Sequence, residues 1–334
     1  MACDKLRTLI FACLQTMNAP ESSPRIVVGF CTYNRADRLP ALVGALRSQT
    51  CDEPFELLAV DNNSTDDTPN VLHALAERAG PRLRIARELQ QGIVPARNRL
   101  IEEAAGADFL IMMDDDELPQ LGWVQAGLSA LRDGGFDCVG GKVRVKFAPE
   151  PRPAWLVDEL LGFLAEVDHG DKPFEITNHG TPIWTANVGY RTSLFRQDLR
   201  FDSRYSRVGK GVGGGEDVVM FNRLLALGCR MAYQPGMVVE HFVESWRLRR
   251  SYFLRLHFTS GLRAGLYAPD VPGRSIFGAP LYLYHQALGQ AWRTLRAAAR
   301  QGHWLRQGMN FTYALGHIVG AQRRARTQPD LPSA

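Results

Sequence analysis

The sequence lacks any closely spaced pair of cysteines. Its six cysteines are scattered, none belongs to a Cys-x-x-Cys pair, and none has a histidine nearby at the spacing of zinc ligands. They are Cys3, Cys13, Cys31, Cys51, Cys138 and Cys229. This pattern argues against a disulfide framework and against a zinc site, and it suits a reducing compartment.

A hydrophobic run long enough to cross a membrane is also missing. The nearest candidate, residues 275–292, has no formal charge, but it contains Pro280, His285 and two glutamines. A spanning helix needs about 20 predominantly apolar residues. The segment is therefore more typical of a helix that lies in a membrane interface.

The N-terminal extension, residues 1–24, lacks the full pattern of a signal peptide. Its short apolar run follows Lys5 and Arg7, but Asp4 is acidic and no clear small-x-small cleavage site is present. We predict a short amphipathic helix in this extension.

Lysine is absent from the C-terminal part, and acids are scarce there. From His241 to the end the chain has 13 arginines and three acids, a local balance of +10. Because the whole chain carries +4, the first 240 residues carry −6. Such asymmetry predicts that the C-terminal part meets something anionic, such as phosphate, a lipid surface or nucleic acid.

The first half of the chain has a regular alternation of apolar and amphipathic segments. Continuous apolar runs, typical of strands, occupy residues 25–33, 55–60, 82–87 and 108–113. Segments with helical spacing lie between them, at residues 38–49, 68–80 and 95–106. Buried strands alternating with helices predict an α/β fold with a mainly parallel sheet.

Polar clusters follow three of the predicted strands. The first strand ends in "CTYNR", the second in "VDNNSTDD" and the fourth in "MDDDE". Each cluster alone has the composition of a helix cap or turn. Since ligands of such sheets bind beyond the carboxyl ends of the strands, three clusters on one edge predict a binding site.

The acidic cluster contains a D-x-D pattern within Asp114, Asp115 and Asp116. Two carboxylates one residue apart can share a hard divalent cation that also binds substrate phosphates. The alternative is a solvated acidic turn. Its position directly after a buried strand favours a metal or substrate site.

A glycine-rich segment, "GKGVGGGEDVVMF" at 209–221, is the second functional signal. It neither follows a clear strand nor continues with Ser or Thr after Lys210, so it fits neither a dinucleotide fingerprint nor a P-loop. We interpret it as a flexible loop that closes over substrate and leads to Glu216 and Asp217 at a helix start. Those acids would complement the helix dipole or present a general base.

Taken in order, these segments resemble glycosyltransferase family 2 with the GT-A fold. The segments are "CTYNR", "VDNNSTDDT", "GIVPARNRLIEEAAGADFLIMMDDDE", "GGGEDVVMFNRLLALG" and "VVEHF". The resemblance covers about residues 25–265, and it is strongest to bacterial exopolysaccharide enzymes of the succinoglycan type.

The resemblance implies an inverting glycosyltransferase with a Rossmann-like, mainly parallel sheet flanked by helices. It implies a nucleotide-diphosphate sugar donor, linked to UDP, and Mn²⁺ or Mg²⁺ as cofactor. The acceptor would be a hydroxyl of a glycan, polyprenyl-diphosphate-linked, at the cytoplasmic face of a bacterial membrane.

The same resemblance assigns residues to the site. The nucleotide-sugar side would comprise Thr32, Asn34, Arg35, Asp61, Asn63, Arg97, Asp114 and Asp115. The metal would be held by Asp114, Asp116 and His241, with Arg247 and Arg250 as phosphate clamps. Asp217 would be the catalytic base, and Trp184, Asn187 and Glu216 would belong to the acceptor pocket or the loop.

Some of these assignments have plainer alternatives. His241 and Trp184 also suit a packed core. The family usually shows D-x-D-D, whereas here the fourth position is Glu117, so the metal-binding pair among the three aspartates stays open.

Residues 266–334 are predicted to form a helical, arginine- and aromatic-rich region that contacts an anionic membrane surface. Tyr282, Tyr284, Trp292, Trp304, Phe311 and Tyr313 lie among its arginines. Cationic, aromatic helices of this kind suit a bilayer interface, and an ordinary solvated face is the alternative. The protein would then be cytoplasmic and peripheral to the membrane.

Two other functions are compatible with parts of the sequence. A nucleotidyltransferase of related fold usually has a glycine-rich, basic loop after its first strand, but "CTYNRADRLP" contains no glycine. A non-catalytic protein that binds nucleic acid or another anion would use the basic tail, but the clusters in residues 1–240 are acidic. We therefore predict no nucleic-acid partner.

Overall fold

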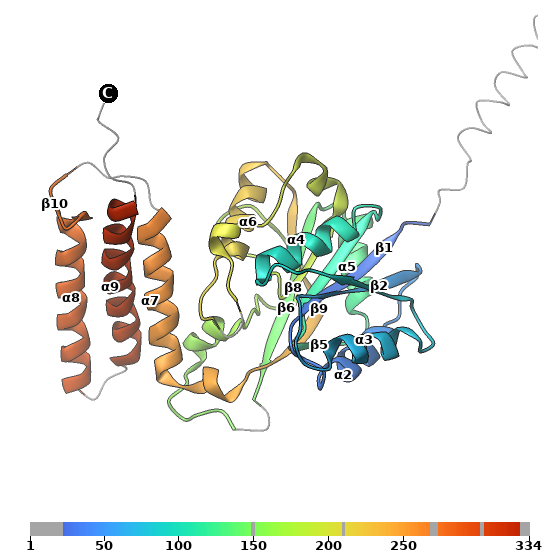
Figure 1. Cartoon of the computed structure of the whole chain (residues 1–334), viewed down its shortest axis with the longest axis horizontal. Coiled ribbons are helices and arrows are strands. Elements are labelled where there is room, and N and C mark those ends of the chain that lie inside the picture. Colours follow the sequence, from blue (N-terminus) through green and yellow to red (C-terminus); the bar gives the residue numbers. More distant parts are fainter. Residues whose placement is uncertain (1–22, 148–150, 209–210, 268–272, 301–303, 328–334) are drawn as a thin grey trace, which may run out of the picture.

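The computed structural model describes residues 23–147, 151–208, 211–267, 273–300 and 304–327 (Figure 1). The amphipathic helix predicted for the N-terminal extension lies outside these residues. Of the glycine-rich segment at 209–221, the structure describes the part from Gly211 onward.

Four parallel strands form the first half of a nine-stranded sheet in the order β3-β2-β1-β4. Their bounds are Ile26–Thr32 for β1, Phe55–Asp61 for β2, Leu83–Arg87 for β3 and Phe109–Asp114 for β4. The connecting helices are α2 (Leu39–Arg47), α3 (Thr68–Ala76) and α4 (Ile93–Glu103). The predicted alternation of strands and helices is confirmed, with α4 beginning two residues before the expected start at Pro95.

The helices cover both faces of this sheet, with α2 and α3 on one side and α4 and α6 (Glu216–Ala226) on the other (Figure 1). In α2 the buried residues are Leu39, Leu42, Val43 and Leu46, the spacing that places one apolar stripe against a sheet. Strand β1 has no charged residue, and nearly all of its residues are buried, as expected for a central strand covered on both faces.

The second half of the sheet is mixed, and the sequence patterns do not predict its topology. Strand β8 (Asn187–Arg191) pairs antiparallel with β4, and the order continues β6-β9-β5. The bounds are Cys138–Lys146 for β6, Met231–Phe242 for β9 and Glu117–Pro119 for β5, while β7 (Phe174–Ile176) pairs with β9. The short β5 folds the acidic turn back toward β9, against which it pairs antiparallel.

Shorter elements complete the main body. They are α5 (Trp123–Arg132) and the 3-10 helices η1 (Asp158–Leu164), η2 (Thr192–Gln197), η3 (Ser203–Tyr205) and η4 (Ser245–Leu248). A second apolar cluster under η1 and η4 includes Leu164, Val243 and Phe253. It connects the main body to the C-terminal helices.

Three long helices form a layer beside the main body (Figure 1). They are α7 (Arg250–Tyr267), α8 (Leu281–Ala299) and α9 (Trp304–Thr327), and a small hairpin of β10 (Ser275–Ile276) and β11 (Ala279–Pro280) precedes α8. Helix α9 lies in the middle, with α7 nearest to the main body and α8 at the outer edge.

Helices α7 and α9 approach so closely that only glycine fits at their contact. A Cβ atom added to Gly261 or Gly265 of α7 would lie 2.0 Å or 2.2 Å from a carbonyl oxygen of α9. A Cβ atom at Gly316 or Gly320 of α9 would lie 2.0 Å or 2.1 Å from a carbonyl oxygen of α7. The backbones of the two helices are therefore in direct contact.

We expect Gly316→Ala to lower the free energy of unfolding by about 1–3 kcal/mol, because the added methyl group forces the two helices apart. Urea unfolding followed by circular dichroism measures this change. The matched control is Gly289→Ala on α8, where an added Cβ would meet no heavy atom within 4 Å. That control should be neutral or stabilising by up to about 1 kcal/mol. An equal loss in both variants would contradict the close helix contact.

Candidate active site

The carboxyl ends of β1, β2 and β4 bring the three polar clusters to one edge of the sheet. Thr32 at the end of β1 lies in register with Asp61 at the end of β2. Its neighbour Cys31 lies in register with Asp114 at the end of β4. The predicted convergence of these clusters is therefore present in the structure.

The loops after β1 and β2 are fastened to each other. The Asn34 side chain accepts a hydrogen bond from the Thr65 backbone at 2.8 Å, and the Asn34 backbone donates to the Ser64 hydroxyl at 3.0 Å. Asp61 is buried and accepts from the Ser64 backbone at 3.1 Å. These residues shape the edge of the sheet, and their contact with a nucleotide stays a prediction.

Asn63 completes this edge of the sheet. Its side-chain oxygen accepts a hydrogen bond from Arg87 at 2.8 Å, and its backbone adopts a φ of +58°, in the left-handed region that asparagine tolerates better than most residues. Asn63 is thus tied to the end of β3 through Arg87, and its contact with a nucleotide stays a prediction.

The three consecutive aspartates lie beside different basic side chains. Asp114 Oδ1 lies 2.9 Å from Arg97 Nη2, and Asp115 Oδ1 lies 3.8 Å from Arg35 Nε. Asp116 Oδ2 lies 3.4 Å from His241 Nε2 and 3.9 Å from Arg247 Nη1. Basic side chains of the protein itself therefore offset the repulsion within the acidic turn.

The two central carboxyl groups differ in acidity. Burial, reinforced by the neighbouring Asp116 charge, raises the pKa of Asp115 to about 7, although Arg35 and Thr32 act against this. Burial also raises the pKa of Asp116, but positive charge from Arg247 and Arg35, and from His241 when it is protonated, outweighs burial and holds that pKa well below its usual range. Asp116 is therefore ionised at neutral pH, whereas Asp115 is partly protonated there.

Glu117 lies inside the protein. It is 2% exposed, and its Oε2 accepts a hydrogen bond from the Asp114 backbone at 3.2 Å. Burial, together with the Asp114 and Asp116 charges, raises its pKa well above the usual range. Where the family usually has the last aspartate of D-x-D-D, this chain therefore has a buried glutamate, and its carboxyl group binds the backbone of the acidic turn at Asp114.

We expect Glu117→Gln to become more stable relative to the natural protein as pH rises. In the folded state the raised pKa keeps Glu117 protonated at pH values where the unfolded chain, with an ordinary pKa of about 4.3, has lost the proton. The natural protein therefore loses stability above that pH, by about 1.4 kcal/mol per unit until the folded-state pKa is reached, and glutamine does not. Thermal melts of both proteins without added metal, over about four pH units from about pH 4 to 8, measure how the difference between their melting temperatures changes with pH. A constant difference in melting temperature would contradict the raised pKa.

Arg97 connects the acidic turn to the start of α6. Its Nη2 binds Asp114, while its Nη1 lies 2.9 Å from Glu216 Oε1 and 3.0 Å from Asp217 Oδ1. The residue is 1% exposed, and its guanidinium lies over the Phe201 ring. The predicted contact of Arg97 with the nucleotide or its phosphates stays a prediction. Arg97 is buried and positions three carboxylates.

The predicted helix start at Glu216 and Asp217 is confirmed, and the two acids have different surroundings. Asp217 Oδ1 also accepts a hydrogen bond from the Thr185 hydroxyl, and its side chain is 18% exposed. Glu216 is buried, and its Oε2 has no hydrogen-bond partner within the described part of the chain. Burial and the Asp217 charge raise the pKa of Glu216. Asp217 is thus the member of the pair that solvent or a substrate can reach.

His241 is held in one orientation by its two ring nitrogens. Its Nδ1 lies 2.9 Å from the Leu164 carbonyl oxygen, which can only accept, so Nδ1 carries the proton. Its Nε2 faces Asp116 and accepts from Arg247 Nη1 at 3.1 Å. A histidine whose Nδ1–H is fixed by a backbone carbonyl is oriented as metal ligands usually are.

Asp116 and His241 are a pair of candidate metal ligands, and Asp114 points elsewhere, toward Arg97. Within the described residues no group of three or more His, Cys, Asp or Glu side chains is arranged to hold a metal ion. Arg250 stacks on the Trp155 ring, 5.0 Å from its centroid, and Arg247 alone of the two predicted clamps approaches Asp116.

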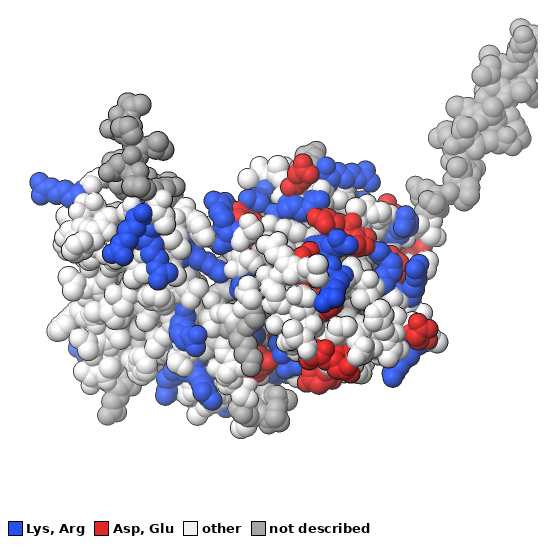
Figure 2. Space-filling model, viewed as in Figure 1, with Lys and Arg blue, Asp and Glu red and all other residues white. Residues whose placement is uncertain are grey.

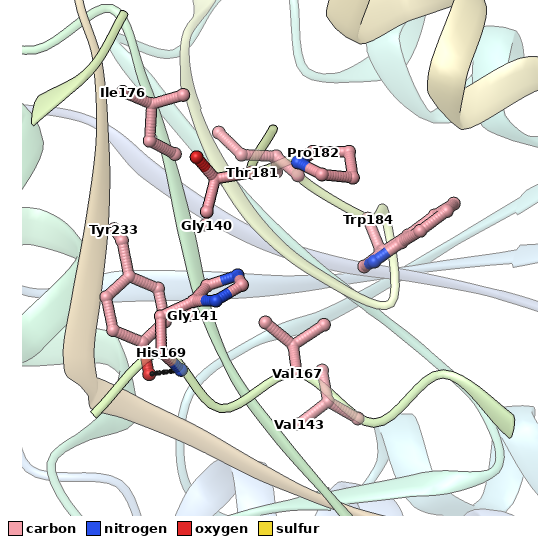
Figure 3. A pocket seen from close by; sticks show the side chains of 11 residues that line it. Gly140, Gly141, Val143, Val167, His169, Ile176, Thr181, Pro182, Trp184 and Tyr233 are labelled. Carbon is pink, nitrogen blue, oxygen red and sulfur yellow. Dashed lines mark hydrogen bonds between the residues drawn. The ribbon is translucent and has the colours of Figure 1, made fainter. Parts of the chain in front are cut away.

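Trp184 lines a small pocket. Figure 3 shows Trp184 at one side of this pocket and His169 and Tyr233 at the other. The residue after Trp184 is Thr185, whose hydroxyl binds Asp217. Neither Thr185 nor Asp217 lines the pocket itself, and its use by an acceptor stays a prediction.

Asn187 does not line this pocket. It is buried, its Oδ1 accepts from the Trp123 indole at 2.8 Å, and its amide group donates to the Lys142 and Met237 carbonyl oxygens. All of these partners are protein groups. In the structure Asn187 joins α5, β6 and β9, and its predicted contact with an acceptor stays a prediction.

Thr185 is a site residue that the sequence reasoning missed. It stands between Trp184 and Asn187 in the segment "IWTANVGY", but a lone threonine carries no chemical signal of its own. Only the contact with Asp217 identifies it.

Comparison with known proteins gives a consistent picture. Residues 27–199, just over half of the chain, match the family model described as Glycosyl transferase family 2. Glycosyltransferase AglE of Haloferax volcanii is 32% identical over 125 residues, which are 37% of this chain and 41% of that protein. A validoxylamine A glucosyltransferase of Streptomyces hygroscopicus is 28% identical over 292 residues, covering 77% of this chain and 66% of that protein. The chain thus spans about two fifths of the first of these relatives.

A solved structure shares the fold over nearly the whole length. The mannosyltransferase PcManGT from Pyrobaculum calidifontis, in complex with GDP-Man and Mn²⁺, superposes with a TM-score of 0.58 at 17% identity, covering 92% of both chains. The predicted GT-A architecture, a mainly parallel sheet flanked by helices with a helical C-terminal region, is confirmed by this likeness and by the elements described above.

Proposed function

The chain belongs to glycosyl transferase family 2, and on that premise we propose that it transfers a sugar from a nucleotide-diphosphate donor to a hydroxyl group of a glycan. The observation that carries this proposal is the bridge made by Arg97. One buried guanidinium joins Asp114, in the acidic turn, to Asp217, at the start of α6. The acidic turn, which would face the donor diphosphate, and Asp217, which would face the acceptor, are thus connected by one side chain.

The acidic turn suits a divalent cation. Asp116 and His241 would hold Mn²⁺ or Mg²⁺, since Asp116 is ionised and the His241 Nε2 lone pair faces it. When bound, the cation would supply positive charge to the departing nucleoside diphosphate. Arg247, which lies beside both residues, would then be placed to contact a phosphate. The sequence left open which of the three aspartates bind the metal, and this geometry favours Asp116 as a direct ligand.

Asp217 would act as the general base. Both of its contacts, with Arg97 and Thr185, are made by Oδ1, so Oδ2 is the oxygen that takes the proton from an acceptor hydroxyl. A base on one side of the sugar and charge stabilisation on the other correspond to a single displacement. Such a displacement inverts the anomeric configuration.

The identities of donor and acceptor form the finer part of the proposal. A shared fold with a mannosyltransferase that binds GDP-Man and Mn²⁺ supports a nucleotide-sugar donor, and we propose UDP as the nucleotide. We propose a polyprenyl-diphosphate-linked glycan as acceptor, in bacterial surface or exopolysaccharide synthesis at the cytoplasmic face of the membrane. The excess of arginine after His241 supports an acceptor with a phosphorylated lipid.

A melting experiment with nucleotides tests the donor and metal sites. We expect one of UDP, GDP, dTDP and CDP to raise the melting temperature in the presence of Mn²⁺, because a ligand at 100 times its Kd stabilises the native state by about 2.7 kcal/mol. Asp116→Asn should lose the Mn²⁺-dependent part of this shift. The control is Asp158→Asn, an exposed aspartate of η1 paired with Arg152, which should keep it.

Two results would count against the proposal. A folded natural protein that responds to none of the four nucleotides would lack the donor site. Pyrophosphate release from a nucleoside triphosphate and a sugar 1-phosphate would instead identify a nucleotidyltransferase.

A further inference from the structure

Helix α8 has an apolar stripe that no part of the described structure covers. Leu288, Trp292 and Leu295 are separated by four and three residues, so they lie on one face of the helix. Their exposed fractions are 69%, 66% and 66%. The opposite face is the one that packs on α9, through Leu283 and Ala287. Three large side chains left exposed in a row are unusual for a solvated helix surface.

The hairpin at the start of α8 extends this apolar surface. Ile276 is 45% exposed and Phe277 is 80% exposed. The hairpin is fixed to the helix because the Tyr284 hydroxyl donates to the Ile276 carbonyl oxygen at 2.8 Å. We call Ile276, Phe277, Leu288, Trp292 and Leu295 together the α8 surface.

Positive charge lies directly beside the α8 surface. Arg293, Arg296 and Arg300 are all exposed and, by helical spacing, lie along one flank of the stripe. From Val271 to Pro329 the sequence has eight arginines and no aspartate, glutamate or lysine. Figure 2 shows the same contrast, because the part of the molecule formed by the three long helices displays blue and white atoms but no red ones on this face.

The α8 surface is also at the outside of the molecule. Helix α8 is the outermost of the three long helices, with α9 between it and α7 (Figure 1). In the described part of the chain no helix combines the length and the apolar character that crossing a membrane requires. Any contact of α8 with a bilayer is therefore a contact with its surface.

We propose that the α8 surface docks the protein on an anionic membrane, with α8 lying in the plane of the interface. Leu288, Trp292 and Leu295 insert among the lipids, and the flanking arginines contact the anionic headgroups. A helix with an apolar stripe, an arginine flank and no acid matches such a surface in both polarity and charge. This docking does not depend on the proposed transferase activity.

A second copy of the chain fits the α8 surface less well. Two copies that meet through this face would bring together arginine flanks with no acidic side chain on either helix to offset them. Like charges held close together oppose association, whereas an anionic bilayer supplies the opposite charge.

Vesicle sedimentation with the full chain tests this proposal. We expect the protein to sediment with vesicles of phosphatidylcholine and phosphatidylglycerol, and much less with phosphatidylcholine alone. The bound fraction should fall as salt rises, because the arginine contribution is screened. Leu288→Glu and Trp292→Glu should each weaken binding roughly tenfold or more, since each replaces an inserting apolar side chain with a charge of the same sign as the lipids.

The control places the same change elsewhere on the surface. Leu121 is 74% exposed but precedes α5 in the main body, so Leu121→Glu should leave vesicle binding unchanged. All three positions are exposed, and the melting temperatures of the variants should therefore stay close to that of the natural protein.

Three results would overturn the proposal. The first is a folded natural protein that does not bind anionic vesicles. The second is equal loss of binding in Leu121→Glu and Leu288→Glu. The third is a dimer, measured by light scattering without lipid, that becomes a monomer in Leu288→Glu, which would assign the α8 surface to a second copy.

Discussion

Replacing Arg97 with methionine is expected to lower the free energy of unfolding by about 3–5 kcal/mol. Arg97 is 1% exposed and is the common partner of Asp114, Glu216 and Asp217. Methionine fills much of the same volume but supplies no charge, so carboxylates that are partly or fully buried would lose their main cation. Urea unfolding measures the loss.

The same helix provides a matched control. Arg99 also belongs to α4 and pairs with a glutamate, Glu103, at 2.6 Å, but its side chain is 39% exposed. Arg99→Met should cost less than about 1 kcal/mol, since solvent screens a surface ion pair. Equal losses in the two variants would show that Arg97 contributes packing alone.

A second substitution keeps the Arg97 test informative if the single variant unfolds. Adding Glu216→Gln to Arg97→Met removes the charge of the most buried of its partners, and part of the lost stability should return. Because the two residues are in direct contact, their effects should not be additive. Strict additivity would contradict the coupling.

Asp217→Asn is expected to lower kcat by about 10²–10⁴-fold and to leave nucleotide binding intact. The donor in this assay is a sugar linked to the nucleotide that the melting experiment identifies. Asparagine retains Oδ1, which accepts from Arg97 and Thr185, so the side chain keeps its position but cannot take a proton. Initial rates of sugar transfer and nucleotide-dependent melting shifts measure the two effects separately.

Asp158→Asn is the control for this variant too, because it removes one carboxylate from an exposed site on η1. Its kcat should equal that of the natural protein. A fall of less than about tenfold in Asp217→Asn would reject Asp217 as the base, because general-base catalysis contributes typically 10²–10⁴-fold.

Much of the fold was predictable because the first half of the chain has strong local patterns. The strand Ile26–Thr32 within the run "RIVVGFCTY" is buried almost throughout, and α2 buries its predicted apolar stripe. Local patterns could not predict that β8 enters antiparallel beside β4, since strand order depends on contacts distant in sequence.

The sequence predicted where the candidate site lies more accurately than it predicted which groups its residues contact. The convergence of Thr32, Asp61 and Asp114 follows from the rule that parallel strands end at one edge. The burial of Arg97 and Asn187 did not follow, because a polar side chain in a motif looks the same whether it meets ligand or protein. Each is satisfied by partners from elements far along the chain.

The sequence by itself determined the parallel core, the acidic turn after a buried strand and the excess of arginine in the C-terminal part. All three depend on composition and on local periodicity, which a chain carries before it folds. Tertiary structure alone decided that each aspartate of the turn has its own basic partner, that Glu117 points inward, and that Leu288, Trp292 and Leu295 stay uncovered. These features depend on which distant surfaces meet, and burial and charge pairing take effect only once those surfaces are in contact.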